Sequence, residues 1–178
     1  MLIKRKGVTL IELLITLGIV SIVLSSIYTF LFTNYNTLNS VNNDLELQSQ
    51  GEKAINFMID SIIEGYGVVE VKATDGSDVV SSTESEISKL SVKKDTYVSI
   101  FELRNGVLYY GEVALETDTN EKANKEICHS IKSIIITTLP SDRSFSNCAG
   151  LKIKITMKSG KTEKVFVNEI YMRNKEGN

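Results

Sequence analysis

The sequence predicts an α+β protein in which one long N-terminal helix precedes an antiparallel β-sheet. An apolar run from Val8 to Phe32 is followed, as far as Glu64, by apolar residues at steps of three and four, which is the spacing of one helix face. From Val68 onward, apolar and polar residues alternate between turn-forming pairs, a pattern typical of antiparallel strands. The sheet is expected to bury its apolar face against the outer half of the helix.

The first part of the helix is long and apolar enough to cross a membrane. Val8–Phe32 carries a single charged side chain, Glu12, and such a run is a membrane-spanning helix rather than a core helix. Lys4, Arg5 and Lys6 precede it, and basic flanks stay on the cytoplasmic side. We therefore expect a single-pass protein with its N-terminus in the cytoplasm and its C-terminal domain outside.

The helix is expected to continue beyond the membrane as an amphipathic extension. Ile55, Met58 and Ile62 mark its apolar face, and Gly65 with Gly67 predicts that the helix ends after Glu64. The expected divisions are a basic N-terminal segment at 1–7, a transmembrane helix at 8–32, an amphipathic extension at 33–64 and an antiparallel β domain at 65–178.

Seven strands are predicted in the C-terminal part. Asn105-Gly106 is the strongest turn signal, because Asn-Gly supplies the two positive-φ residues of a type I′ hairpin. Ser159-Gly160 predicts another turn. The predicted strands are Val68–Lys72, Glu86–Lys93, Thr96–Arg104, Val107–Leu115, Ile127–Leu139, Leu151–Lys158 and Lys164–Arg173.

The carboxylate of Glu12 requires a functional explanation, because an acidic residue at the centre of a membrane helix costs about 2.5–3.5 kcal/mol. From Lys4 the chain reads Lys-Arg-Lys-Gly-Val-Thr-Leu-Ile-Glu-Leu-Leu. This resembles the N-terminal signature of type IV pilins and pseudopilins, although Val8 stands where that family usually has Phe. The resemblance implies that residues 1–7 are a leader and that 8–32 form an assembly helix as well as a membrane span. It implies cleavage after Gly7 by a prepilin peptidase and N-methylation of Val8. It also implies that Glu12 neutralises the terminal amine of a neighbouring subunit during assembly.

The same resemblance implies a pilin fold and a structural role in a type IV pilus or pseudopilus. Glu169–Asn174 is similar to the last strand of PilW-like minor pilins, which favours a minor subunit of a priming or tip complex. The implied partners are other pilins, the prepilin peptidase, the pilus assembly platform and, before assembly, membrane lipid. The protein would lie in the cytoplasmic membrane and then in the cell-surface pilus. Adhesion or motility, DNA uptake and protein secretion systems all use such subunits.

Two other interpretations of the N-terminus compete with this one. A secretory signal peptide has an apolar stretch of about 7–15 residues, and Val8–Phe32 is longer. A plain anchor would make the chain a membrane-anchored binding module, an adhesin or sensor that is not assembled into a filament. In that case Glu12 would have no role.

No enzyme and no cofactor are predicted. His129 is the single histidine, and Cys128 beside it is the obvious nucleophile. Neighbouring residues of a strand point to opposite faces, so these two side chains would make a poor catalytic pair.

No metal site is predicted either. One histidine and two cysteines fall short of the four ligands of a zinc site. Glu116, Asp118 and Asn120 alternate like calcium ligands, but Glu121 stands where the calcium loop needs Gly. A solvated acidic loop is the simpler interpretation, with calcium binding as the alternative.

Cys128 and Cys148 are a candidate disulfide, because a domain outside the cytoplasm meets oxidising conditions. A simple hairpin of Ile127–Leu139 with Leu151–Lys158 opposes the bridge, since it places the two cysteines near opposite ends of the ladder. The sequence leaves both alternatives open.

The charge of the chain does not favour a nucleic-acid partner. The formal net charge is −2, and loss of a leader with three basic residues lowers it to −5, a charge that repels phosphate. The exception is a strip of lysines, which forms either the solvated face of a hairpin or a local DNA contact. The strip consists of Lys152, Lys154, Lys158, Lys161 and Lys164.

Overall fold

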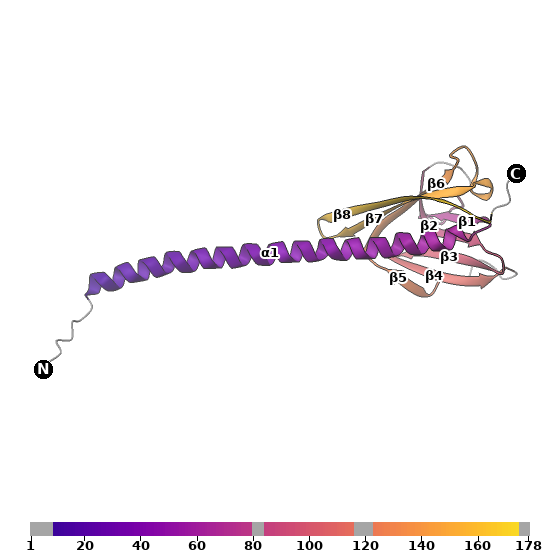
Figure 1. The fold of residues 1–178 in the computed structure, drawn as a ribbon. Coiled ribbons are helices and arrows are strands. Elements are labelled where there is room, and N and C mark those ends of the chain that lie inside the picture. The colour runs from indigo at the N-terminus through magenta and orange to yellow at the C-terminus, as the bar shows by residue number, and fades with distance from the viewer. Residues whose placement is uncertain (1–8, 80–83, 116–122, 175–178) are drawn as a thin grey trace. The chain divides into compact units, whose positions relative to one another are not determined.

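A computed structural model describes residues 9–79, 84–115 and 123–174. It confirms the α+β class, with one long helix and an antiparallel sheet (Figure 1). The elements are α1 (Leu10–Ile63), β1 (Gly67–Ala73), β2 (Ser85–Lys93), β3 (Tyr97–Arg104), β4 (Val107–Ala114), β5 (Lys125–Cys128), β6 (Ile131–Leu139), the 3₁₀ turn η1 (Phe145–Asn147), β7 (Gly150–Ser159) and β8 (Thr162–Tyr171).

The chain divides into two compact units, Met1–Asn42 and Asn43–Asn178. The described part of the first unit consists almost entirely of α1, and none of its residues is buried. Its apolar side chains, such as Leu14, Val20 and Ile27, are each about half exposed or more. An apolar helix surface of this size requires lipid or other protein helices around it.

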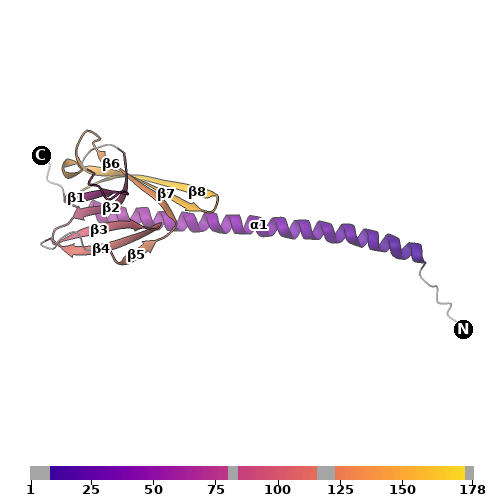
Figure 2. The same ribbon diagram turned by 180° about the vertical axis from the view of Figure 1, so that it is seen from behind.

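In the second unit, the strands form one sheet in the order β5-β4-β3-β2-β6-β7-β8, and β1 pairs with β2. β2 joins the two halves, because Ser85 and Glu86 pair with β6 while later residues pair with β1 and β3. The sheet curls around the last turns of α1, with β7 and β8 on one side and β3 to β5 on the other (Figures 1 and 2).

The core lies between the outer part of α1 and the concave face of the sheet. Leu47, Ala54, Met58 and Ile62 are fully buried, and their spacing of seven or four residues places them on one helix face. They pack in one cluster with residues of the sheet, which include Leu90, Phe101, Leu108, Ile136, Ile153 and Ile155. The predicted packing of helix on sheet is confirmed, because these α1 residues are buried against the sheet.

The tightest predicted turn is confirmed. Asn105 and Gly106 have φ angles of 51° and 76°, as a type I′ turn requires, and β3 pairs with β4 up to Arg104 and Val107. The β7–β8 turn lies one residue later than predicted. Its two loop residues are Gly160, with a φ of 56°, and Lys161.

The predicted single strand Ile127–Leu139 is wrong, because the chain breaks there into β5 and β6. Ser130 has a φ of 66°, which turns the backbone between two different ladders. Ile131 donates its N–H to the Gly106 carbonyl at 2.9 Å. β5 therefore pairs with β4, whereas β6 pairs with β7.

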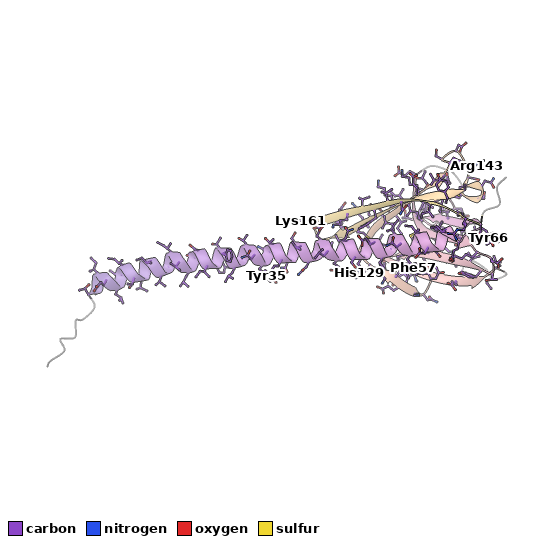
Figure 3. All side chains as sticks on the ribbon, in the orientation of Figure 1. Tyr35, Phe57, Tyr66, His129, Arg143 and Lys161 are labelled. Atoms are coloured by element: carbon purple, nitrogen blue, oxygen red, sulfur yellow. The ribbon has the colours of Figure 1, made fainter. Side chains whose placement is uncertain are left out.

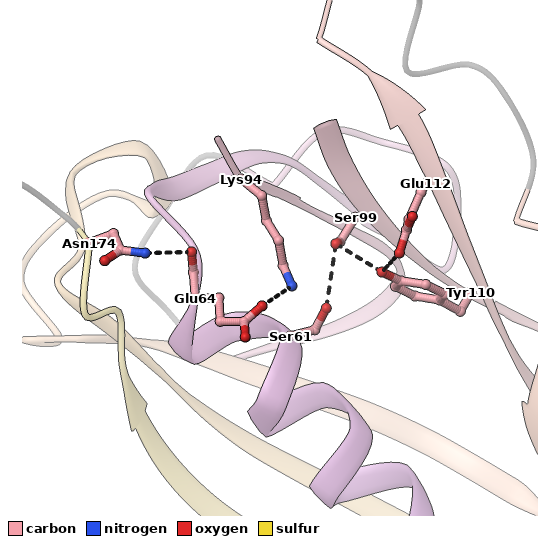
Figure 4. Close-up of polar contacts among 7 residues, drawn as sticks. All are labelled: Ser61, Glu64, Lys94, Ser99, Tyr110, Glu112 and Asn174. Carbon is pink, nitrogen blue, oxygen red and sulfur yellow. Dashed lines mark hydrogen bonds and ion pairs between the residues drawn. The ribbon is translucent and has the colours of Figure 1, made fainter. Parts of the chain in front are cut away.

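The C-terminal end of α1 is held by hydrogen bonds from distant parts of the chain (Figure 4). Gly65 donates its N–H to the Ile62 carbonyl at 2.9 Å, and Arg173 donates its N–H to the Ile63 carbonyl at 2.9 Å. Asn174 donates from Nδ2 to the Glu64 carbonyl at 3.0 Å. These bonds satisfy carbonyls that a helix end otherwise leaves unpaired.

An ion pair adds to this attachment. Lys94 Nζ lies 2.9 Å from Glu64 Oε2, and hydrogen bonding and charge from Lys94 lower the pKa of Glu64. Burial opposes the charge of Lys94, but Glu64 and Tyr97 outweigh burial and raise the pKa of Lys94. Arg173 and Asn174, the β2–β3 connection and the helix end are thus linked.

Candidate processing and assembly site

The N-terminal end of α1 contains the residues that the sequence singles out for processing and assembly. Gly7 and Val8 lie outside the described residues. The structure begins at Thr9, which precedes the first residue of α1 and makes reciprocal hydrogen bonds with Glu12. Glu12 donates its N–H to Thr9 Oγ1 at 3.3 Å, and Thr9 donates both its N–H and its hydroxyl to Glu12 Oε2 at 3.1 Å.

This arrangement is a capping box, in which Thr and Glu three residues apart satisfy each other's backbone donors at a helix start. The sequence carried the signal, Thr-x-x-Glu ahead of an apolar run, but our sequence analysis assigned no role to Thr9. Glu12 also lies in the first turn of α1, where the helix dipole favours negative charge. Local contacts therefore offset part of the cost of a carboxylate in an apolar segment.

One oxygen of Glu12 stays open. Within the residues that the structure describes, Oε1 of Glu12 accepts no hydrogen bond, whereas Oε2 accepts two. A carboxylate oxygen in apolar surroundings requires a donor or a cation. The geometry leaves one oxygen of Glu12 for a partner that this part of the chain does not supply.

The serine and threonine hydroxyls of the apolar segment are satisfied within the helix. Hydroxyl side chains donate to backbone carbonyls about one turn earlier, at 2.8–3.0 Å, a pattern that suits a helix in lipid. The donors are Thr16, Ser21, Ser25, Ser26 and Thr29. Among the described residues, α1 is the one helix that is long and apolar enough to cross a membrane.

The candidate disulfide between Cys128 and Cys148 is not formed in the structure, and both side chains are buried. Cys128 lies just before Ile131, which pairs with Met157, whereas Cys148 lies just before Gly150 at the other end of the same ladder. Seven strand residues at about 3.3 Å each separate those ends, far more than the Cα separation of about 7 Å that a bridge allows. Cys148 Sγ instead donates to the Phe145 carbonyl at 3.1 Å.

Cys128 and His129 do not form a catalytic pair. Burial raises the pKa of the Cys128 thiol to about 11, which disfavours the reactive thiolate. The contacts of His129 are with Ser130 Oγ, 2.9 Å from Nδ1, and with Glu46 of α1, 3.7 Å from Nε2. His129 therefore lies beside the helix (Figure 3).

The three residues considered as calcium ligands, Glu116, Asp118 and Asn120, lie outside the described residues. In the parts of the chain that are described, no group of three His, Cys, Asp or Glu side chains could hold a metal ion.

The lysine strip lies on the β7–β8 hairpin, and carboxylates accompany most of its charges. Lys152 pairs with Glu169 at 3.0 Å, and Lys158 pairs with Glu163 at 3.2 Å. Lys164 reaches Asp44 of α1 at 3.0 Å. Lys154 lies at the limit of an ion pair, 4.0 Å from Glu84, and Lys161 marks the hairpin tip (Figure 3). This pattern fits a solvated hairpin face better than a phosphate-binding surface.

The family described as the prokaryotic N-terminal methylation motif matches residues 2–28. The match covers the basic leader, the expected cleavage position and Glu12. No curated protein and no solved structure matches the chain. The motif is that of pilin-like substrates of prepilin peptidase, which are structural proteins rather than enzymes and are anchored by an apolar N-terminal helix. The chain therefore carries the N-terminal methylation motif of pilin-like proteins, and its long helix packed on a curled antiparallel sheet matches the α+β pilin fold.

Proposed function

We propose that this chain is a minor subunit, in the priming or tip complex, of a type IV pilus or pseudopilus. The observation that carries the proposal is the coincidence of three features at one end of the chain. The methylation motif covers residues 2–28, the segment is an uncovered apolar helix from Leu10 onward, and its one carboxylate, Glu12, keeps an oxygen open among the described residues.

The first step is processing in the cytoplasmic membrane. The basic leader stays on the cytoplasmic side and the β domain lies outside. Prepilin peptidase cuts after Gly7, and Val8 becomes the N-terminal, methylated residue. The cut creates a cationic amine four residues before Glu12, at the end of a helix that lipid surrounds.

The second step is assembly, in which helices of neighbouring pilins replace lipid around α1. The open oxygen of Glu12 then accepts the terminal amine of a neighbouring subunit. Opposite charges attract far more strongly in apolar surroundings than in water, and neither group is stable there alone. The pair therefore stabilises subunits in which Glu12 meets the neighbour's amine, relative to subunits that are shifted along the helix axis.

Two observations favour a minor subunit over the main repeating one. The chain has no Pro before Pro140, so the span lacks a proline break. The PilW-like ending is also part of the attachment of α1, since Arg173 and Asn174 donate to carbonyls at its end. A priming or tip subunit must hold its β domain in a defined position. The attachment of Arg173 and Asn174 to the end of α1 fixes the domain on its helix.

N-terminal sequencing of protein from sheared filaments and from membranes tests this function. The mature chain should begin at Val8 with a methylated amine, and Gly7→Val should leave an uncut precursor in the membrane. Gly18→Val, which changes a glycine with open space around it, is the matched control and should be processed normally. Chains that keep Met1, or that are cut beyond Phe32, would support a plain anchor or a secreted protein instead.

A further inference from the structure

The middle of α1, residues 33–43, is fully exposed and carries no charge. Each of these residues is exposed, including Tyr35, Leu38 and Val41, whose side chains are apolar or aromatic. The chain has no charged residue between Glu12 and Asp44. We call residues 33–43 the asparagine segment, because five of its residues are asparagine, namely Asn34, Asn36, Asn39, Asn42 and Asn43.

The asparagine segment has little that favours a helix. All of its residues except Leu38 are asparagine, threonine, serine, valine or tyrosine, which form helices less readily than alanine, leucine or the long charged residues. Among the described residues, the one side-chain hydrogen bond of the segment runs from Thr37 Oγ1 to the Thr33 carbonyl at 2.9 Å, and such bonds slightly destabilise a helix. The asparagine side chains make no hydrogen bond within the described part of the chain.

Both neighbours of the segment are supported, each in a different way. On its N-terminal side, α1 is apolar enough to lie in lipid, where a backbone without helical hydrogen bonds is strongly disfavoured. On its C-terminal side, Leu47 is buried in the core, and Asp44 pairs with Lys164 of the β7–β8 hairpin at 3.0 Å. The asparagine segment is neither apolar enough for lipid nor buried by the sheet.

A break within a helix is unfavourable, because it requires a second helix start, which is disfavoured by a factor of about 1000. One weak helix former therefore does not open a helix. In the asparagine segment the weak formers follow one another over about three turns, and their deficits add up against that factor. The boundary between the two compact units, after Asn42, falls at the end of this segment.

We propose that the asparagine segment is a hinge, at which α1 opens locally and reversibly between its membrane-spanning part and the part that the β domain holds. Opening breaks hydrogen bonds within the helix and no packing, because the side chains of the segment are exposed. An extended residue spans about 3.4 Å instead of 1.5 Å, so full opening lengthens the connection by about 20 Å. The β domain can then turn while its own fold and the span stay intact. This goes beyond the pilus role, from which it takes only the anchoring of α1 in lipid.

Residue-resolved amide exchange measures the opening. The full-length protein is placed in discs of phosphatidylethanolamine and phosphatidylglycerol. The amides of residues 37–43 donate to carbonyls one turn earlier in the segment, so they exchange when the segment opens. Their protection factors, which compare each amide with an unstructured chain of the same sequence, should be at least tenfold lower than those of residues 52–62.

Replacing four asparagines by alanine should close the hinge. Alanine is the best helix former, and these asparagine side chains make no hydrogen bond that the change would remove, so the protection factors of residues 37–43 should rise at least tenfold. Asn56→Ala is the matched control, because Asn56 is exposed on the part of α1 that the β domain holds, and it should leave those protection factors unchanged. The four substitutions are Asn36→Ala, Asn39→Ala, Asn42→Ala and Asn43→Ala.

Chymotrypsin gives a second readout, since it needs an unfolded segment to cut after Tyr35 or Leu38. It should separate the β domain from the span in wild type and cut the four-alanine chain several-fold more slowly. Equal protection of residues 37–43 and 52–62 in wild type would overturn the proposal, and so would a four-alanine chain with unchanged protection. Neither readout depends on filaments, so a chain that is never assembled would count against the pilus role alone.

Discussion

The ring of Phe166 on β8 packs directly on Gly51 of α1, in the space that a side chain at position 51 would occupy. Gly51 is buried in the middle of a helix, where glycine is unfavourable by about 1 kcal/mol relative to alanine. The close approach explains why it is tolerated. Lys164, two residues before Phe166, adds a hydrogen bond to Gln48 at 3.1 Å and an ion pair to Asp44. Together these contacts fix the β7–β8 hairpin on the helix.

Gly51→Ala should therefore destabilise the protein despite its better helix propensity. The added methyl group overlaps the ring of Phe166, and overpacking costs about 1–3 kcal/mol. Denaturation of the full-length protein in detergent, followed by circular dichroism, measures the change in free energy of unfolding. Gly67→Ala is the control, because nothing lies within 4 Å of a methyl group there. A Gly51→Ala variant more stable than wild type would show that the ring moves aside freely.

Glu12→Leu should separate assembly from processing. Removing the carboxylate leaves the cleavage position and the apolar helix in place, so leader removal and membrane insertion should be unchanged or improved. Recovery in filaments or in the tip complex should fall several-fold, because the neighbour's amine loses its partner. Immunoblots of sheared filament and membrane fractions measure both quantities.

Glu52→Leu makes the same change in the same helix, but in the second unit, and should leave assembly unaltered. Wild-type recovery of the Glu12→Leu chain in filaments would disprove the charge-pair mechanism. The likeness to pilins would survive that result, because it depends on the motif and the fold.

Local patterns predicted most of this structure, and long-range contacts explain what they missed. Alternation and Asn105-Gly106 placed the strands to within a few residues, because both signals reside in neighbouring side chains. The break at Ser130 has no glycine or proline to announce it and depends on a hydrogen bond between Ile131 and Gly106. The burial of Lys94 depends on Glu64, thirty residues earlier, which no local pattern shows.

The two cysteines should contribute no redox-dependent stability. No disulfide joins them, so a reductant should leave the melting temperature unchanged, whereas a bridge closing about 20 residues would be worth about 3 kcal/mol. Thermal unfolding with and without reductant measures this. A fall of several degrees under reductant would mean that the two strands are paired differently.

Cys128 should also make stability depend on alkaline pH. Burial raises the pKa of its thiol from 9.0 to about 11, so between these values the unfolded chain loses a proton that the folded chain keeps. The contribution of the protonated Cys128 thiol to the free energy of unfolding is complete below pH 9 and is lost as the pH rises toward 11. Cys128→Ala should therefore flatten the decline of the free energy of unfolding in this window. If the free energy of unfolding of Cys128→Ala declined as steeply as that of wild type, the decline would come from tyrosines and lysines instead.

The ion pair between Glu64 and Lys94 should act in the opposite direction, at acidic pH. Lys94 lowers the pKa of Glu64 below 4.5, so the folded state holds this carboxylate ionised where the unfolded state already binds a proton. The contribution is complete above pH 4.5 and is lost as the pH falls through the lower pKa of the folded state. In Lys94→Gln the unfolding free energy should depend less on pH in this window. Urea denaturation at a series of pH values from 3 to 6 measures the slope of unfolding free energy against pH.

Lys152→Gln, which breaks the exposed pair with Glu169, is the control and should keep the wild-type slope. An unchanged slope in Lys94→Gln would mean that other carboxylates dominate the acid response and that the attachment of the helix end depends on Arg173 and Asn174 alone.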